Sequence, residues 1–349
     1  MSIKALEIEG LRCLERTVWS PGPGLNAITG INGAGKTSLL EAIALACTGK
    51  ALRSGGARAA IAKGQDRLAV RMAVGEGLEA GAVRYERSPT DRIWAWDGTP
   101  IRSAAVVYER VPLMVFSPET HYAVVQDASA RRAAMYWLMF HVEHQFLEVW
   151  RRYQRLLRQR NTALRARDRN YRAFDPGLVQ ISAVLAGMWE RALESLQAPF
   201  AALIAQQGLG VAADIRIRPG WPGGSLEAAL EACRETDERL GYTQVGPHRA
   251  DIGFRVGGRP IQEVASHGQQ KVVVSAWRLA LVVRAVEAGR RPVLLLDDLG
   301  AELDRRRRAA FYETLGGLGL QAFVTALEPE PLPSPAFMFH VEQGRLHGP

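Results

Sequence analysis

Eight residues near the N-terminus, Gly30–Thr37, have the types and the spacing needed to bind phosphate. They match the pattern G-x-x-x-x-G-K-[ST] at every fixed position. The apolar run Leu25–Ile28 precedes them and an apolar helical pattern follows from Ser38, which is the required strand–loop–helix context. The glycines let successive N–H groups point at phosphate oxygens, and the helix dipole adds positive potential. The pattern predicts a nucleoside triphosphate site, an interpretation we favour over a glycine-rich turn with a surface lysine.

Side chains within and just after the loop have distinct expected roles. Lys36 would neutralise the β- and γ-phosphates, and the Thr37 hydroxyl would ligate Mg²⁺. The residues expected to contact the nucleotide are Gly30, Ile31, Asn32, Gly33, Ala34, Gly35, Lys36, Thr37 and Ser38.

A second chemical feature is an apolar run, Val293–Leu296, that ends in two acids, Asp297 and Asp298. A run this apolar indicates a central parallel strand, and ligands bind at the carboxyl edge of such sheets. Asp297 would hold Mg²⁺, directly or through water. Asp298, one residue further along, would orient or deprotonate the attacking water. The alternative is a strand that simply ends in a polar turn.

The segment Ser266–Lys271 opens an apolar-periodic helical stretch and allows two interpretations. A serine and a glycine at a helix start offer a hydroxyl and free N–H groups, which could form a second anion site. The alternative is a routine N-cap on a buried helix, and on these residues alone it is the favoured interpretation.

The elements that position these residues are arranged as a split α/β domain. Strand-like alternation dominates residues 1–110, and long helical patterns occupy Ala128–Thr162 and Leu178–Gln207. Pro199 should kink or break the second of these helices. Strand patterns return from Gly241. We therefore expect a head with a mixed sheet, built from residues 1–110 and 238–349, with a helical insertion at residues 111–237.

Composition limits the function classes. The formal charge is +8 and the pI about 9.7, which favours a polyanionic partner such as nucleic acid. Nine arginines against one acid lie between Arg151 and Arg172, either a DNA-facing helix or a solvated face. The three separated cysteines suggest neither a disulfide framework nor a metal site. No apolar run is long enough for a membrane span and no signal sequence is apparent, so we expect a cytoplasmic protein without a membrane partner.

Taken together, these stretches resemble the ABC-type ATPases and, more narrowly, the RecF family of bacterial recombination mediators. Ala265–Gln269 resembles the ABC signature, Asp297–Asp298 the end of Walker B, and Ala301–Asp304 the D-loop. The signature departs from the family pattern at Ala265 and His267. Further similar stretches are Gly49–Arg53, Phe116–Glu119, Gln159–Asn161, Gly241–Arg249 and Phe339–Gly344. The resemblance covers essentially the whole chain, in order.

The resemblance implies a P-loop ATPase head of the SMC/Rad50 type with a short helical lobe. It implies weak, DNA-modulated ATP hydrolysis that serves as a switch, with Ser266, Gly268 and Gln269 meeting the ATP of a second subunit in a homodimer. It further implies binding to single-strand/double-strand DNA junctions, and cooperation with RecR and RecO to load RecA in gap repair and replication-fork recovery. Arg53 resembles an arginine that contacts phosphate, and a solvated loop arginine is its alternative.

Other interpretations remain open at this stage. The nucleotide-binding subunit of a membrane transporter shares the ATP motifs but lacks so large a helical insertion. A P-loop small-molecule kinase has no use for Ser266–Gln270. His248 and Asp251 could suggest a metal site or a catalytic triad, but no third group is suitably spaced, so we expect a structural role.

Overall fold

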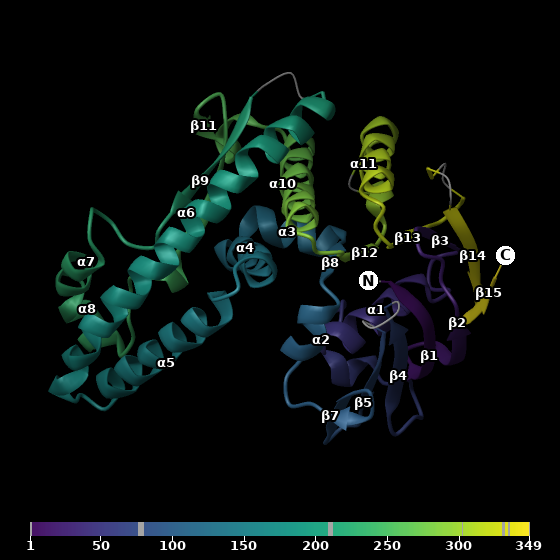
Figure 1. The fold of residues 1–349 in the computed structure, drawn as a ribbon, viewed down its shortest axis with the longest axis horizontal. Helices are drawn as coiled ribbons and strands as arrows, with labels where there is room; N and C mark the ends of the chain where they lie inside the picture. The colour runs from purple at the N-terminus through teal and green to yellow at the C-terminus, as the bar shows by residue number, and fades with distance from the viewer. Residues whose placement is uncertain are drawn as a thin grey trace. The chain divides into compact units, whose positions relative to one another are not determined.

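The computed structural model describes residues 2–75, 80–208, 212–301, 303–329, 332–333 and 336–348. The chain forms two compact units, one from residues 1–121 and 289–349 and the other from residues 122–288 (Figure 1). The boundaries expected at residues 110 and 237 differ from this division. Residues 238–288 belong to the helical unit because strand β10 (Asp251–Val256) pairs along strand β9 (Ala213–Arg218).

In the described part of the chain, the first unit holds a six-stranded sheet in which five neighbouring strands are parallel. Its order is β15 (Arg345–His347), β14 (Ala336–Glu342), β3 (Leu25–Thr29), β13 (Ala322–Ala326), β12 (Val293–Leu296) and β8 (Leu113–Phe116). Strand β12 is wholly buried, which confirms the central strand predicted from its leucines. Because β3, β13 and β12 are adjacent and parallel, their carboxyl ends meet at one edge.

A second, antiparallel sheet completes this unit. Its order is β2 (Leu14–Trp19), β1 (Ile3–Leu11), β4 (Leu68–Val74), β5 (Gly81–Arg87), β6 (Arg92–Trp96) and β7 (Thr99–Pro100). Helix α1 (Lys36–Thr48) packs against strands of both sheets, and its residues Ser38–Cys47 are buried in the shared apolar core. The remaining helices are α2 (Ala105–Arg110), α11 (Arg305–Leu318), η1 (Ala57–Ala60) and η5 (Leu299–Ala301), while α3 (Pro118–Gln126) crosses into the second unit.

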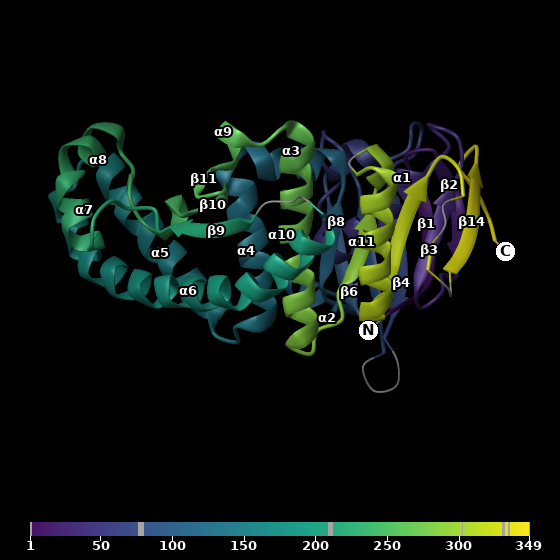
Figure 2. The ribbon, with the colours of Figure 1, turned by 90° about the horizontal axis from the view of Figure 1, so that it is seen from above.

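The second unit is mainly helical. Its long helices are α4 (Ala128–Val142), α5 (Phe146–Arg165), α6 (Asp175–Gln206) and α10 (His267–Glu287), and α5 and α6 pack against each other (Figures 1 and 2). The shorter elements are η3 (Arg169–Phe174), α7 (Leu226–Ala232), α8 (Arg234–Leu240), η4 (Pro247–Arg249), β11 (Arg259–Pro260) and α9 (Ile261–Val264). In the described residues, no helix combines the length and apolar character that crossing a membrane requires.

Helix α6 continues through Pro199. The break offered as one of two outcomes there does not occur, although proline removes one backbone hydrogen bond. Leu196 and Phe200, on either side of the proline, are almost fully buried. Their packing offsets the lost bond and keeps the helix continuous.

A buried ion cluster joins helix α5 to α8 and to the segment that follows it. Arg160 of α5 is 1% exposed and donates to Asp237 at 2.7 Å, to Asp175 at 2.6 Å and to the Thr243 hydroxyl at 2.9 Å. Asn161 accepts hydrogen bonds from the backbone and the hydroxyl of Thr243. The two stretches 159–161 and 241–249, which both resemble the family, are therefore linked by one network of hydrogen bonds.

His248 belongs to the same hydrogen-bond network. Both of its ring nitrogens have partners within the protein, which confirms its expected structural role. The Tyr153 hydroxyl lies 2.5 Å from Nδ1 of His248, and Nε2 lies 3.1 Å from the Thr243 carbonyl oxygen. The carbonyl can only accept, so Nε2 carries a proton, and the Tyr153 hydroxyl can donate to Nδ1 of a neutral ring. Burial lowers the pKa of His248 to about 4. Asp251, the other residue in question, instead pairs with Arg131 at 2.7 Å.

We predict that His248 makes the protein less stable as the pH falls from 6.5 toward 4. In that window the unfolded chain takes up a proton that the folded imidazole refuses, so the stability present above pH 6.5 is lost on acidification. The loss should be at most about 3 kcal/mol, since one pKa unit corresponds to about 1.4 kcal/mol. Urea unfolding of the wild type and His248→Asn at pH 7 and near pH 4 measures it. An equal acid loss in both proteins would contradict the assignment.

Candidate nucleotide-binding site

The segment between β3 and α1 forms a glycine loop at the carboxyl edge of the parallel sheet. Gly30 has a φ of 147°, and a Cβ there would lie 2.3 Å from the Val341 carbonyl oxygen. Gly35, with a φ of 121°, occupies the N-cap of α1, and no side chain caps the helix. The first N–H groups of α1 are therefore available to an anion, aided by the helix dipole.

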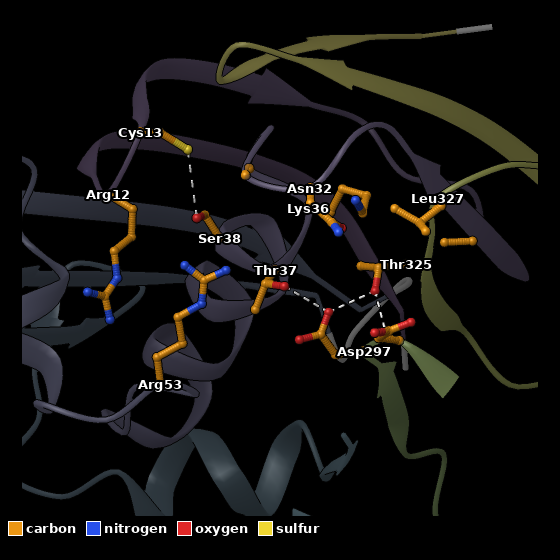
Figure 3. Close-up of a pocket in the computed structure, with 14 residues that line it drawn as sticks. Arg12, Cys13, Asn32, Lys36, Thr37, Ser38, Arg53, Asp297, Thr325 and Leu327 are labelled. Atoms are coloured by element: carbon orange, nitrogen blue, oxygen red, sulfur yellow. Dashed lines mark hydrogen bonds between the residues drawn. The ribbon is translucent and has the colours of Figure 1, made fainter. Parts of the chain in front are cut away.

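This loop borders a cavity of about 590 Å³, which is ample for a nucleotide (Figure 3). The predicted residues that line it are Asn32, Gly33, Gly35, Lys36, Thr37, Ser38, Arg53, Asp297 and Asp298. Gly30, Ile31 and Ala34 belong to the loop but do not line the cavity. Ser266, Gly268 and Gln269 lie in the second unit.

Lys36 extends over its own loop. Its Nζ donates to the carbonyl oxygens of Gly30 at 2.6 Å and Ile31 at 3.0 Å. Burial lowers the pKa of Lys36, and the charges of Asp297 and Asp298 oppose that effect. The ammonium is thus held at the loop, within the electrostatic influence of two carboxylates, where it can meet the negative charge of a phosphate.

Asp297 follows β12 and connects three strand ends. Its Oδ1 accepts hydrogen bonds from the hydroxyl of Thr37 at 2.9 Å and from that of Thr325 at 2.7 Å (Figure 3). Burial raises the pKa of Asp297, against the effect of these two hydrogen bonds. Thr37 and Asp297 bring together a hydroxyl and a carboxylate, the hard oxygen donors that Mg²⁺ prefers. In the described residues no cluster of three or more His, Cys, Asp or Glu could hold a metal.

Asp298 differs from Asp297 in environment. Its backbone N–H donates to the Thr325 hydroxyl at 3.0 Å, and its φ of 49° is left-handed. Among side chains other than glycine, aspartate and asparagine tolerate that conformation best. The side chain is exposed at the cavity wall. It can therefore reach water in the cavity, whereas Asp297 is held by hydroxyls.

Two arginines border the cavity in different ways. Arg12 donates to the carboxylate of Glu41 at 2.9 and 3.1 Å and to the Ala59 carbonyl at 2.7 Å. The hydrogen bonds with Glu41 raise the pKa of Arg12. Glu41 is fully buried in α1, and it also accepts the backbone N–H of Arg53 at 3.3 Å. The exposed Arg53 side chain forms no ion pair in the described residues, so Arg12 is fixed and Arg53 is free to turn toward a ligand.

Sequence reasoning missed several residues here. Glu41, Cys13, Thr325 and Leu327 carried no prediction, yet the last three line the cavity. Only Glu41 left a usable signal, as a single carboxylate within the apolar run Leu39–Cys47.

The predicted signature lies at the start of α10, in the second unit. The Ser266 hydroxyl accepts the Gln269 N–H at 3.3 Å, and the Gln269 side chain accepts the Ser266 N–H at 2.9 Å. This is a capping box, so the N-cap alternative is realised. A serine hydroxyl that accepts one hydrogen bond can still donate its own proton. Ser266 and Gly268 are also exposed, so the cap leaves the anion-site interpretation open.

The predicted D-loop is only partly described. Glu302 lies outside the described residues. Leu303 is buried, and Asp304 caps α11 by accepting the Arg307 N–H at 2.9 Å.

Comparisons with known proteins also find similarity to ATP-binding proteins. A model of the AAA domain family matches residues 5–103. The DNA replication and repair proteins RecF of Thioalkalivibrio sulfidiphilus and Chromohalobacter salexigens are 39% and 36% identical, and each alignment covers 99% of both chains. A solved structure of the recombination mediator RecF-ATPrS in the RecFOR pathway has a TM-score of 0.85 at 22% identity and covers 99% of this chain and 98% of that one.

A more distant structural likeness is the Smc head bound to the C-terminal winged-helix domain of ScpA. Its TM-score is 0.62 at 13% identity, and it covers 99% of this chain and 96% of that chain. These structures confirm the expected ABC-type head fold with its helical lobe. Given the identity with full-length relatives, the chain belongs to the RecF family.

Proposed function

We propose that this protein is an ATP-dependent DNA-binding protein of recombinational gap repair and replication-fork recovery. The observation that carries the proposal is the meeting of Thr37 and Asp297 at 2.9 Å beneath the uncapped start of α1. Membership of the RecF family favours a role in DNA repair over the two other functions that use the same nucleotide motifs, membrane transport and small-molecule phosphorylation. The related proteins are named for replication and repair, and one solved relative is described in the RecFOR pathway.

The nucleotide phosphates would lie in the glycine loop. Backbone N–H groups of α1 and the Lys36 ammonium would compensate their charge, and Arg53, which also lines the cavity, would add a further positive charge. Thr37 and Asp297 would hold Mg²⁺, which neutralises phosphate oxygens when bound. Asp298 orients or deprotonates the attacking water. Slow hydrolysis of this kind would act as a switch.

A second copy of the chain would complete the nucleotide site. The exposed start of α10, with Ser266, Gly268 and Gln269, would contact the γ-phosphate held by a second copy of the chain. ATP would thereby close a homodimer on DNA at a single-strand/double-strand junction, and hydrolysis would reopen it. RecR and RecO are the expected protein partners for loading RecA, in the cytoplasm.

We predict opposite phenotypes for the two neighbouring aspartates. Asp298→Asn keeps the left-handed backbone acceptable, so it should bind nucleotide within about twofold of wild type while hydrolysis falls by about 10² or more. Asp297→Asn should instead weaken the Mg²⁺-dependent part of nucleotide binding. Fluorescent ATP-analogue titrations with and without Mg²⁺, together with phosphate release, separate the two effects. If Asp298→Asn loses the Mg²⁺-dependent binding while Asp297→Asn keeps it, the two roles are reversed.

A two-subunit site predicts complementation between inactive variants. Ser266→Arg should bind ATP as a monomer but fail to dimerise or hydrolyse, because the longer side chain blocks the partner's phosphate. Lys36→Met should fail because the phosphates lose a charge-assisted contact worth about 1.5–3 kcal/mol. A mixture of the two should regain dimers, since one of its two interfaces keeps both an intact loop and an intact α10 start.

Ser225→Arg is a matched control for the lost cap. Ser225 is the exposed N-cap of α7 and accepts the Ala228 N–H at 3.1 Å, much as Ser266 caps α10. Light scattering with ATP and ADP should show normal dimerisation for this variant. A mixture of well-folded Ser266→Arg and Lys36→Met that stays monomeric would refute the shared site.

A further inference from the structure

Helix α5 has two sharply different faces. The residues that it buries are Phe146, Tyr153, Leu157, Arg160 and Leu164. Because successive residues turn by about 100°, Arg151, Arg155, Arg158 and Arg165 fall within about 80° of one another on the opposite side. All four are exposed, and we call them the α5 stripe.

The stripe is not neutralised by the protein. None of its four arginines forms an ion pair with an acid in the described residues, and Arg165 donates to the Thr162 hydroxyl at 3.4 Å. Other surface arginines of the same unit do have acidic partners, such as Arg172 with Glu231 and Arg191 with Glu143. Glu148 is the only acid within α5.

The length of the stripe matches the regular spacing of phosphates along duplex DNA. From Arg151 to Arg165 the helix rises about 21 Å, which is close to the rise of six base pairs of duplex DNA at about 3.4 Å each. Arginine pairs with phosphate through two parallel N–H donors. None of the large exposed hydrophobic side chains of the described chain lies on α5. A surface without an apolar centre is a poor protein interface and a good phosphate contact.

We propose that the α5 stripe binds the phosphate backbone of duplex DNA. This inference rests on the proposed DNA-binding function and assigns it a surface. The contacts follow the backbone and carry no base-specific information. They let the protein engage duplex of any sequence, and the binding must weaken as salt rises because phosphate contacts release counterions.

The test compares two triple variants of equal charge. Arg151→Gln/Arg155→Gln/Arg158→Gln removes most of the stripe and keeps good helix formers. Arg216→Gln/Arg234→Gln/Arg259→Gln removes three surface arginines of the same unit that already have acidic partners. Thermal melts and ATP-analogue binding establish that both variants are intact. Fluorescence anisotropy with a labelled duplex, between about 50 and 200 mM salt, then gives affinity and salt slope.

We expect the stripe variant to lose at least about tenfold in affinity and its log–log salt slope to become shallower by about 2 to 3, at about 0.9 per phosphate. The control should stay within about one unit of the wild-type slope. Equal affinities and slopes for the two triples would overturn the inference alone. If the stripe variant binds DNA like the control but loses binding to poly-glutamate, an acidic protein is the occupant and the inference is also wrong. If the wild-type protein itself does not bind DNA, both the proposed function and this inference are wrong.

Discussion

The candidate site depends on the parallel alignment of three adjacent strands. β3 leads into the glycine loop and Thr37, β13 supplies Thr325, and β12 delivers Asp297 and Asp298. Parallel pairing brings all three carboxyl ends to the same edge of the sheet, where side chains separated by up to 260 residues in sequence meet through hydrogen bonds of 2.9 Å or less. Thr325 is central to this arrangement because its hydroxyl donates to one aspartate and accepts from the backbone of the next.

In each unit an arginine pairs with a fully buried carboxylate and holds distant segments together. Glu41 ties the turn at Arg12 to helix α1, and Arg160 ties α5 to the segment around Asp237. Removing one partner from such a pair costs about 3–5 kcal/mol because the other charge is left buried and uncompensated. In the first unit Glu41 holds Arg12 and the backbone of Arg53, and both arginines line the nucleotide cavity. The stability of this unit and the geometry of its site are therefore linked through Glu41.

The predictions that succeeded rested on local sequence patterns. The loop at Gly30–Thr37, the wholly buried strand before Asp297 and the helix start at Ser266 each have a spacing that forces one local structure. Thr325 and Glu41 could not be predicted in the same way, because their roles arise from strand register and from packing across the unit. The expected boundaries at residues 110 and 237 differ from the division into two compact units for a similar reason. The pairing of β9 with β10 joins segments on either side of residue 237, and no local pattern marks it.

The connectivity of the two units has a consequence for synthesis on the ribosome. The helical unit is one continuous stretch, so it can fold as soon as residue 288 has emerged, because domains generally fold as units. Strand β3 must wait, since both of its neighbours in the sheet, β13 and β14, lie beyond residue 321. The phosphate loop therefore acquires its supporting sheet only when translation is nearly complete. A nascent chain would carry a folded, arginine-rich helical unit before it carries a finished nucleotide pocket.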